Sequence, residues 1–305
     1  MDGVAEEAEI EQHHAPGTAR GIVEARGFVW SFRHRCCLYS GGQTVTAKEP
    51  SKVLPIGVSM TARNEARNLP RSLGSVRDWV EEIVVVVNDC TDGTEDVALG
   101  FGARVVEHPW QGYRDQKRFA LAQARAEWVL ALDADEEVSP ALREDIFRFF
   151  EGDHMRFAGA MFPRKVWFLG RWITHGDWYP DWSLRLFRRG EGQWEGSPEH
   201  DKIVLRGECQ RLSGDLHHYS NPTLCSHVDK ITVFSDYFLQ RQLERGRQWS
   251  AVESVFRPWW RFLRAYVLRC GFLDGYPGYY IAKATAFATL VRYSRLYEHE
   301  ANSCK

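Results

Sequence analysis

The sequence predicts an α/β fold with a mostly parallel central sheet flanked by helices, followed by a helical and aromatic C-terminal extension. Apolar runs alternate with helical segments between residues 54 and 138. The run EEIVVVVN at 81–88 is rich in β-branched residues, as in strands buried on both faces of a parallel sheet. Strands that alternate with helices form right-handed crossover units, and ligands bind beyond the carboxyl ends of such strands.

The elements of this pattern follow one another in order. Each strand is expected from a short apolar run, and each helix from apolar residues at helical spacing. They are a strand at 56–62, a helix at 63–79, a strand at 81–88, a turn and helix at 89–102, a strand at 103–109, a helix at 114–126 and a strand from 127 that ends in acids.

Three regions are expected along the chain. Residues 1–50 show no sustained period and read as a poorly ordered extension. Residues 51–225 would form the sheet domain. Residues 226–305 turn helical, with a basic and aromatic segment near the end.

Composition narrows the class of protein. The 305 residues are 44% hydrophobic and 26% charged, with a net charge of −2, so no global field favours a nucleic-acid partner. The seven cysteines are scattered without a CxxC pair, which indicates reduced thiols and no cysteine-based zinc site. No uncharged apolar run approaches the roughly 18 residues that a membrane span needs, and the acidic N-terminus is unlike a secretory signal. A cytoplasmic location is expected.

Four carboxylates follow the last strand, in VLALDADEEV at 129–138. Two carboxylates one residue apart can hold a divalent cation, and Mg²⁺ and Mn²⁺ prefer such oxygen donors. Alternatively Asp133 is structural, and the acids that follow cap a helix near Ser139. A phosphatase with an aspartate nucleophile is a weaker interpretation, because Glu137 stands where such enzymes carry Thr or Val.

The order of MTARNEARNL, VVVVNDCTDGT and HPWQGYRDQKRFALAQARAEWVLALDADEE resembles the family 2 glycosyltransferases of GT-A (nucleotide-diphospho-sugar transferase) fold, over about residues 55–138. The later GRWITHGDWYPDWSLRLFRR, EHDK, LHHYSNPTL and GFLDGYPGYY resemble the lipopolysaccharide core β-glucosyltransferases. With these motifs the likeness extends to about Tyr297.

The resemblance implies a donor site. Thr61 and Ala62 would line the nucleobase pocket, and Glu65 would lie near the donor. The family's base-binding Asp is replaced by Val87, so the base would be read by Asn88 or, second, Asp89. The remaining positions implied on the donor side are Lys117, Asp133 and Ala134. For Lys117, a solvated surface charge is the alternative.

The same resemblance implies a metal and a base. Asp135 would bind Mg²⁺ or Mn²⁺ on the diphosphate, Asp133 would reach the ribose or the metal through water, and His218 could reach the diphosphate or metal. Asp201 is the expected general base, with Glu199 as the second candidate. A polar loop at the base and a core histidine at His218 are the alternatives.

Aromatic residues beside acids suit a sugar acceptor, because rings stack on apolar sugar faces and acids accept hydrogen bonds from hydroxyls. The acceptor residues expected on this basis are Trp178, Tyr179, Asp181 and Arg185, although tryptophans at this density are equally typical of a core.

The predicted activity is therefore inverting, metal-dependent transfer of a sugar such as glucose. The donor would be a nucleoside-diphosphate sugar, with UDP as the nucleotide, and the acceptor a glycolipid or oligosaccharide of the lipopolysaccharide core or another envelope glycan. A non-catalytic nucleotide-sugar binder and a metal-dependent phosphatase are the alternatives. The arginines and aromatic residues of 257–269 resemble an interfacial helix, which would place the enzyme on the inner face of the cytoplasmic membrane. A helix packed on the domain with an arginine rim is equally consistent with that segment.

Overall fold

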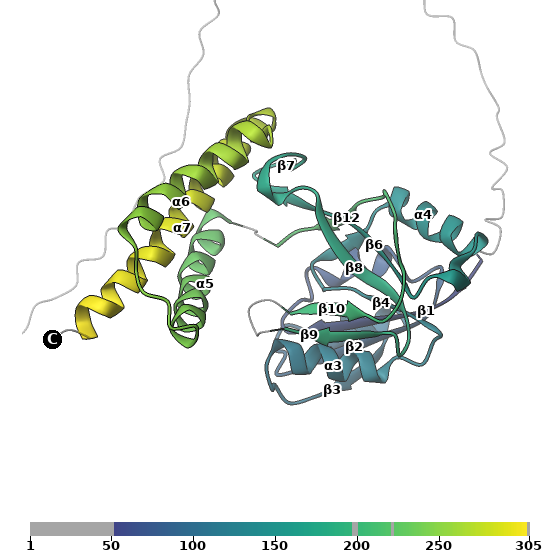
Figure 1. Cartoon of the computed structure of the whole chain (residues 1–305). Coiled ribbons are helices and arrows are strands. Elements are labelled where there is room, and N and C mark those ends of the chain that lie inside the picture. The colour runs from purple at the N-terminus through teal and green to yellow at the C-terminus, as the bar shows by residue number, and fades with distance from the viewer. Residues whose placement is uncertain (1–51, 197–200, 221–222, 304–305) are drawn as a thin grey trace, which may run out of the picture. The chain divides into compact units, whose positions relative to one another are not determined.

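The computed structural model describes residues 52–196, 201–220 and 223–303, all within the unit Lys48–Lys305 (Figure 1). The predicted extension at 1–50 and the candidate base Glu199 lie outside these ranges. Up to residue 151 the elements are β1 (Leu54–Ala62), α1 (Leu69–Gly74), β2 (Val80–Val87), α2 (Thr94–Gly100), β3 (Arg104–Glu107), α3 (Tyr113–Gln123), β4 (Trp128–Ala131), β5 (Glu136–Val138) and α4 (Pro140–Glu151).

The rest of the sheet and the C-terminal helices follow. The strands and short helices are η1 (His154–Arg156), β6 (Gly159–Phe168), β7 (Arg171–Trp172), η2 (Gly176–Trp178), β8 (Asp181–Arg188), β9 (Gly192–Glu195), β10 (Lys202–Leu205), β11 (Cys209–Arg211) and β12 (Leu216–His218). The C-terminal helices are α5 (Leu224–Glu244), α6 (Ala251–Leu263), η3 (Arg264–Leu268), η4 (Gly271–Asp274) and α7 (Gly275–Ser303).

The sheet has the order β3-β2-β1-β4-β8-β6-β12-β5. Strands β3, β2, β1 and β4 pair in parallel, as the alternating pattern predicts. Beyond β4 the sheet becomes mixed, because β8 is antiparallel to both β4 and β6. Strand β12 runs parallel to β6 and antiparallel to β5. This topology confirms the predicted α/β class and brings the segments after β4 and β12 together.

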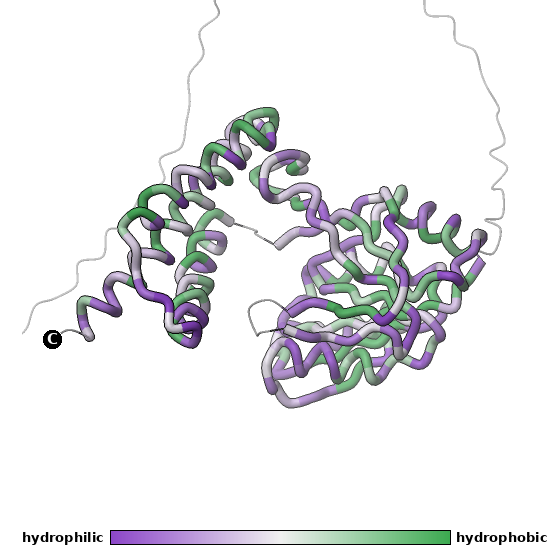
Figure 2. Tube along the Cα trace, in the orientation of Figure 1, coloured by the Kyte–Doolittle hydropathy of each residue, from purple (hydrophilic) through white to green (hydrophobic). Residues whose placement is uncertain are grey.

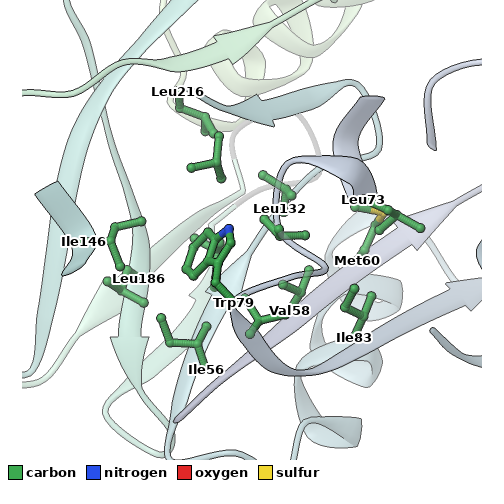
Figure 3. Close-up of a cluster of buried hydrophobic side chains, with 14 of the residues drawn as sticks. Ile56, Val58, Met60, Leu73, Trp79, Ile83, Leu132, Ile146, Leu186 and Leu216 are labelled. Atoms are coloured by element: carbon green, nitrogen blue, oxygen red, sulfur yellow. The ribbon is translucent and has the colours of Figure 1, made fainter. Parts of the chain in front are cut away.

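The β-branched run in β2 is buried on both faces of the sheet. Val85 and Val87 join the larger core on one face, whereas Val84 and Val86 pack against Ala120 of α3 on the other. Figure 3 shows the larger core, in which Trp79 lies among aliphatic side chains of the sheet and helices. Side chains buried to this degree each contribute roughly 1.5–3 kcal/mol, so this core fixes the strand ends that carry the site.

The first predicted helix is much shorter than expected, since 63–79 contains only α1 at Leu69–Gly74. Asn64 adopts a left-handed φ of 57°, and its Oδ1 accepts a hydrogen bond of 2.8 Å from the Thr91 backbone N–H. Polar groups of the loop after β1 therefore bind the loop after β2 and do not continue a helix. The prediction failed because these partners are distant in sequence.

The C-terminal helices α5, α6 and α7 pack on one another. Figure 2 shows hydrophobic residues along these helices as well as in the sheet. Among the helices that the structure describes, none is both long and apolar enough to cross a membrane. The boundary between residues 225 and 226 stays a prediction; α5 begins at Leu224.

Candidate active site

The residues expected to bind the nucleobase follow the neighbouring ends of β1 and β2. Thr61 lies opposite Val86 in the parallel register, and Ala62 lies opposite Val87. Val87 is packed in the core, so it presents no polar group to a ligand. Asn88 is 3% exposed, and its Nδ2 has no hydrogen-bond partner in the described part of the chain. This buried donor is available to a ligand.

Glu65 lies in the loop after β1 and is held against the loop after β2. Its backbone N–H donates to Thr94 Oγ1 at 2.8 Å, and Asn68 Nδ2 donates to its carboxylate at 2.7 Å. Burial raises the pKa of Glu65, the Asn68 hydrogen bond partly opposes this, and the charge of Asp135 adds to the increase. Glu65 and Asp135 are thus near each other. Asp89 lies in the loop after β2 and has a left-handed φ of 43°.

Asp133, directly after β4, is bound by two cations from different elements. Arg185 Nη2 of β8 lies 2.7 Å from Asp133 Oδ2, and Lys117 Nζ of α3 lies 3.1 Å from Asp133 Oδ1. Burial by itself would raise the pKa of Asp133, but Arg185 and then Lys117 outweigh it and hold the pKa well below its ordinary value. Both oxygens of Asp133 are therefore engaged by the protein.

Glu136, which the sequence did not single out, is the buried centre of this charge network. Its side chain is 0% exposed, and it accepts hydrogen bonds from Arg185 at 2.8 Å and from Arg164 at 3.3 Å. Its other oxygen accepts from the Asp133 backbone N–H at 3.0 Å. Arg164 also binds Asp181 at 2.6 Å. The position of Glu136 in the acid run was visible, but nothing in the sequence indicated Arg164 as its partner.

Asp135 and Glu137, the other two acids of the run, contact β12 and the residue that follows it. His218 Nε2 lies 3.3 Å from Asp135 Oδ2. Burial alone would raise the pKa of Asp135, but the hydrogen bond and charge of His218 lower it below its ordinary value. The Tyr219 hydroxyl donates to Glu137 at 2.8 Å, and His217 Nδ1 lies 3.8 Å from the same carboxylate. Each of the four clustered acids thus has a basic partner.

Asp201 lies beside the Asp-x-Asp motif although β10, which it precedes, belongs to a separate two-stranded ribbon. Lys117 Nζ is 3.3 Å from Asp201 Oδ2, and the same ammonium lies 4.5 Å from the centre of the Trp194 ring. Asp133 and Asp201 therefore share one cation and line one cavity of about 650 Å³. Trp194 is a further part of this site that the sequence did not indicate.

The four predicted acceptor residues occupy different places. Trp178 and Asp181 line a second cavity, described below. The Tyr179 hydroxyl donates to Asp215 at 2.9 Å, and Arg185, with a side chain 7% exposed, lies between Asp133 and Glu136. Arg185 is thus part of the charge network under the motif.

The donors around Asp135 suit a divalent cation. Carboxylate and imidazole ligands are both used by Mn²⁺, and phosphate oxygens can supply the remaining positions. His218 Nδ1 is buried without a partner in the ranges that the structure covers, and in those ranges no group of three or more His, Cys, Asp or Glu side chains is arranged to hold a metal. The protein would thus supply Asp135 and His218, while Ala134, 5% exposed, offers backbone only.

Comparison with known proteins agrees with this geometry. Residues 58–204 match the model of glycosyl transferase family 2. The chain is 28% identical to an uncharacterized glycosyltransferase of Rickettsia typhi over 253 residues, which cover 80% of this chain and 87% of the relative. It is also 28% identical to the lipopolysaccharide core biosynthesis glycosyltransferase LpsC of Rhizobium meliloti, over 81% of this chain and 94% of LpsC.

Among solved structures, the chain is similar to S. aureus TarS in complex with UDP-GlcNAc. The two are 13% identical with a TM-score of 0.43, and the match covers 81% of this chain and 92% of the matched chain, TarS 1-349. The sequence matches, the α/β sheet and the Asp-x-Asp motif that follows β4 lead to one conclusion: residues 58–204 form a domain of glycosyl transferase family 2.

Proposed function

We propose that this enzyme transfers a sugar, with inversion and with a divalent metal, from a UDP-sugar to a saccharide of the lipopolysaccharide core. One observation carries the proposal. Lys117 lies within 3.3 Å of both Asp133 and Asp201, so Asp133 of the Asp-x-Asp motif and the proposed base line the same cavity. The printed name of the relative LpsC supports the acceptor class, and glucose is the proposed sugar on the strength of the motifs at 170–280.

On the donor side, Asn88 is the proposed base-reading residue. Its amide can both donate and accept, which matches the alternating edge of uracil, and its buried Nδ2 is free of any partner within the described residues. Thr61 and Ala62 would border the base, with Asp89 beside it. Glu65 would lie near the diphosphate end, because it is close enough to Asp135 for the two charges to interact.

Asp135 and His218 would hold Mg²⁺ or Mn²⁺ on the diphosphate. The metal, when bound, stabilises the charge that develops on the departing nucleoside diphosphate. Asp133 would act on the ribose side, held as a carboxylate by Lys117 and Arg185. Two carboxylates one residue apart are tolerable here because each has its own partner, Lys117 and Arg185 for Asp133 and His218 for Asp135.

Asp201 is the proposed general base. It would accept the proton of the acceptor hydroxyl while that oxygen attacks the anomeric carbon opposite the leaving diphosphate, which inverts the configuration. A carboxylate is a weak base in water, so Asp201 must act by position. The Lys117 ammonium at 3.3 Å and the Trp194 ring beneath it keep this end of the cavity ordered.

A thermal-shift panel tests the donor side. UDP, GDP, CDP and ADP are each added with and without Mn²⁺, and ligands that bind the native state raise the unfolding temperature. We expect UDP with Mn²⁺ to give the largest shift, and Asn88→Ala to remove the preference for uracil. A panel without any metal-dependent shift of the unfolding temperature would contradict the proposal. In a separate activity assay, release of the sugar to water without transfer to an acceptor would favour a hydrolase.

The exposed side chains of α6 bear on the proposed contact with a membrane. Helix α6 exposes an apolar side that includes Val252 at 76% and Trp259 at 57%. Arg257 pairs with Glu253 at 2.7 Å, and Arg261 contacts Asp177 at 3.3 Å, so part of the basic charge is already compensated. We propose that this helix rests on anionic lipid chiefly through its apolar side chains, with a smaller electrostatic contribution than the sequence implied.

A further inference from the structure

A second cavity, of about 510 Å³, adjoins the one that contains Asp133 and Asp201. Arg164, Asp181 and Phe234 line both cavities, so they are neighbours that share a wall. The second cavity is lined further by α5, α6 and α7, with Lys230, Arg261 and Arg292 among its residues. A ligand in the first cavity can therefore extend into the second.

The helices around this cavity bring together more cations than anions. Asp177 lies 3.3 Å from Arg261, 3.5 Å from Arg264 and 3.4 Å from Arg269, so one carboxylate serves three guanidinium groups. The cavity's other carboxylate, Asp181, is bound by Arg164. Both acids that line the cavity are thus already bound by arginines.

Within the described residues, two arginines nearby have no carboxylate partner. In the ranges covered by the structure, neither Arg241 of α5 nor Arg292 of α7 forms an ion pair, and the Nε of each is buried without a hydrogen-bond partner. Burial lowers the pKa of Arg292, and the charges of Arg261 and Arg241 lower it further. Three guanidinium groups from three helices thus repel one another around this site.

The other groups that face the cavity do not supply negative charge. Burial, followed by the charge of Lys230, lowers the pKa of His227, which favours its neutral form at pH 7. Thr289 donates its hydroxyl to the Thr285 carbonyl at 2.9 Å. Apolar side chains complete the wall, among them Val166 and Ile231. Arg292 is half-buried, its Nε is buried without a hydrogen-bond partner in the described residues, and it lies beside an apolar wall. An anionic ligand would stabilise this arrangement.

We propose that this cavity binds an anionic substituent, a phosphate or a carboxylate, of the saccharide acceptor. This proposal rests on the proposed function, because it takes the adjoining cavity as the place of transfer. With its anionic group against Arg292 and Arg261, the acceptor would reach across Arg164 and Asp181 toward Asp201. The site would thereby select charged saccharides over neutral ones.

The test uses the full chain with inorganic phosphate and glucose 6-phosphate as probes, titrated by calorimetry in the presence of saturating UDP and Mn²⁺. His218, which would hold the metal on the donor diphosphate, also lines the second cavity. Saturation of the donor site with UDP and Mn²⁺ therefore tests whether the anion site is separate from the place of the diphosphate. We expect both probes to bind, and Arg292→Gln to weaken each about tenfold, as for the loss of a charge-assisted hydrogen bond. Arg245→Gln, at an exposed position just after α5, removes the same charge and should leave binding unchanged.

Stability of the ligand-free chain gives a second readout. Because Arg292 is crowded by like charges, Arg292→Gln should leave the unfolding temperature unchanged or raise it, while the stabilisation by phosphate disappears. A clear loss of stability without ligand would show that Arg292 is structural, and would overturn the proposal.

Three other outcomes are informative. If UDP with Mn²⁺ blocks phosphate binding, the cations belong to the donor site and the proposal fails. Binding of phosphatidylglycerol vesicles that depends on Arg292, without binding of either soluble probe, would assign the cations to a lipid headgroup and would also overturn it. If UDP with Mn²⁺ does not bind while glucose 6-phosphate does, the proposed function fails but the anion site stands.

Discussion

The charged side chains at the sheet edge and those of the C-terminal helices are arranged in opposite ways. At the edge, Asp133, Asp135 and Glu136 each contact a cation or imidazole within 3.3 Å. Among the helices, Arg241 and Arg292 have no ion pair within the described residues, and α6 exposes large apolar side chains. The acids of the first region are thus paired, whereas these two arginines of the second region are not.

This difference indicates different roles. A network whose charges are already paired is preorganised, so binding a donor requires little rearrangement there. Unpaired cations and exposed aromatic side chains gain stability only when a partner arrives. The sheet edge is therefore suited to chemistry, and the helices to recognition of the acceptor and its surroundings. The predictions below test this division, beginning with the largest effect.

Replacing Asp135 should have the largest effect. Asp135→Ala removes the carboxylate that would hold the metal, so transfer should fall by at least about 10³-fold, since a metal contributes several kcal/mol to transition-state stabilisation. Metal-dependent binding of UDP should disappear while the fold remains. Turnover and calorimetry measure both, with Asp153→Ala at an exposed position as the control. Normal turnover by the Asp135 variant would sink the metal assignment.

The second prediction concerns the general base. Asp201→Asn keeps the shape of the side chain but cannot accept a proton, so kcat should fall about 10²–10⁴-fold. Affinity for UDP with Mn²⁺ should stay nearly unchanged. The same change at Glu199, which lies outside the described residues, should be milder. A dead Glu199→Gln beside an active Asp201→Asn would transfer the role to Glu199, and two active variants would make this loop structural.

The third prediction tests whether the edge network is structural as well as functional. Glu136→Gln removes the charge that Arg185 and Arg164 share, while Asp133 still pairs with Arg185 and Asp181 still pairs with Arg164. Weakening such hydrogen bonds between charged groups costs about 1.5–3 kcal/mol. We expect urea unfolding to show a loss of this size. Glu151→Gln, at an exposed position, serves as the control. Equal stability of the two variants would mean that the network adds little to folding.

The pH dependence of stability provides a smaller effect. Because the pKa of Asp133 is lower in the folded chain than in the unfolded chain, its ionisation stabilises the fold above the unfolded pKa of about 3.9. That contribution is lost as pH falls below this value, by about 1.4 kcal/mol per pH unit at most. The stability gap between the native chain and Asp133→Asn should therefore narrow between pH 5 and pH 3. A constant gap would contradict the ion-pair account.

The smallest effect concerns membrane binding by α6. Trp259→Ala should weaken sedimentation with anionic vesicles, and moderate salt should weaken binding by only a few-fold, since each basic residue near a surface contributes about 1 kcal/mol. Val204→Ala, at an exposed position on β10, is the control. If vesicles do not bind at low salt, α6 packs against protein. The proposal that the C-terminal helices contact a membrane would then fail.

The sequence predicted the first four strands because their signal is local; it did not predict β5 to β12. The apolar runs that contain β1, β2 and β4 indicate buried strands without any other part of the sequence. The position of the acids follows from where β4 ends. The first helix was overextended because Asn64 binds Thr91, a partner 27 residues away. A loop of this kind has no local sequence signature.

The site was predictable only in part for the same reason. Asp133, Asp135, Lys117 and His218 were expected from family motifs, and the structure brings them together. Arg164 and Trp194 were not predicted, because each belongs to the site only through contacts with residues on other strands. Arg185 was expected on the acceptor side; it lines the cavity that contains Asp201 and also pairs with Asp133, a contact that its neighbours in sequence did not indicate. Nothing in one sequence determines which face of β8 meets the acids.

The place of β12 in the sheet has a consequence for how the chain folds during synthesis. The strand inserts between β6 and β5, and Tyr219, which follows it, bonds Glu137 across 82 residues of sequence. On the ribosome, the acids emerge long before their partners at 217–219. Since domains form from the N-terminus onward and distant contacts form slowly, the nascent chain would carry an acidic, incompletely closed sheet until β12 arrives. Closure of the sheet and assembly of the metal-binding pair would then be one event.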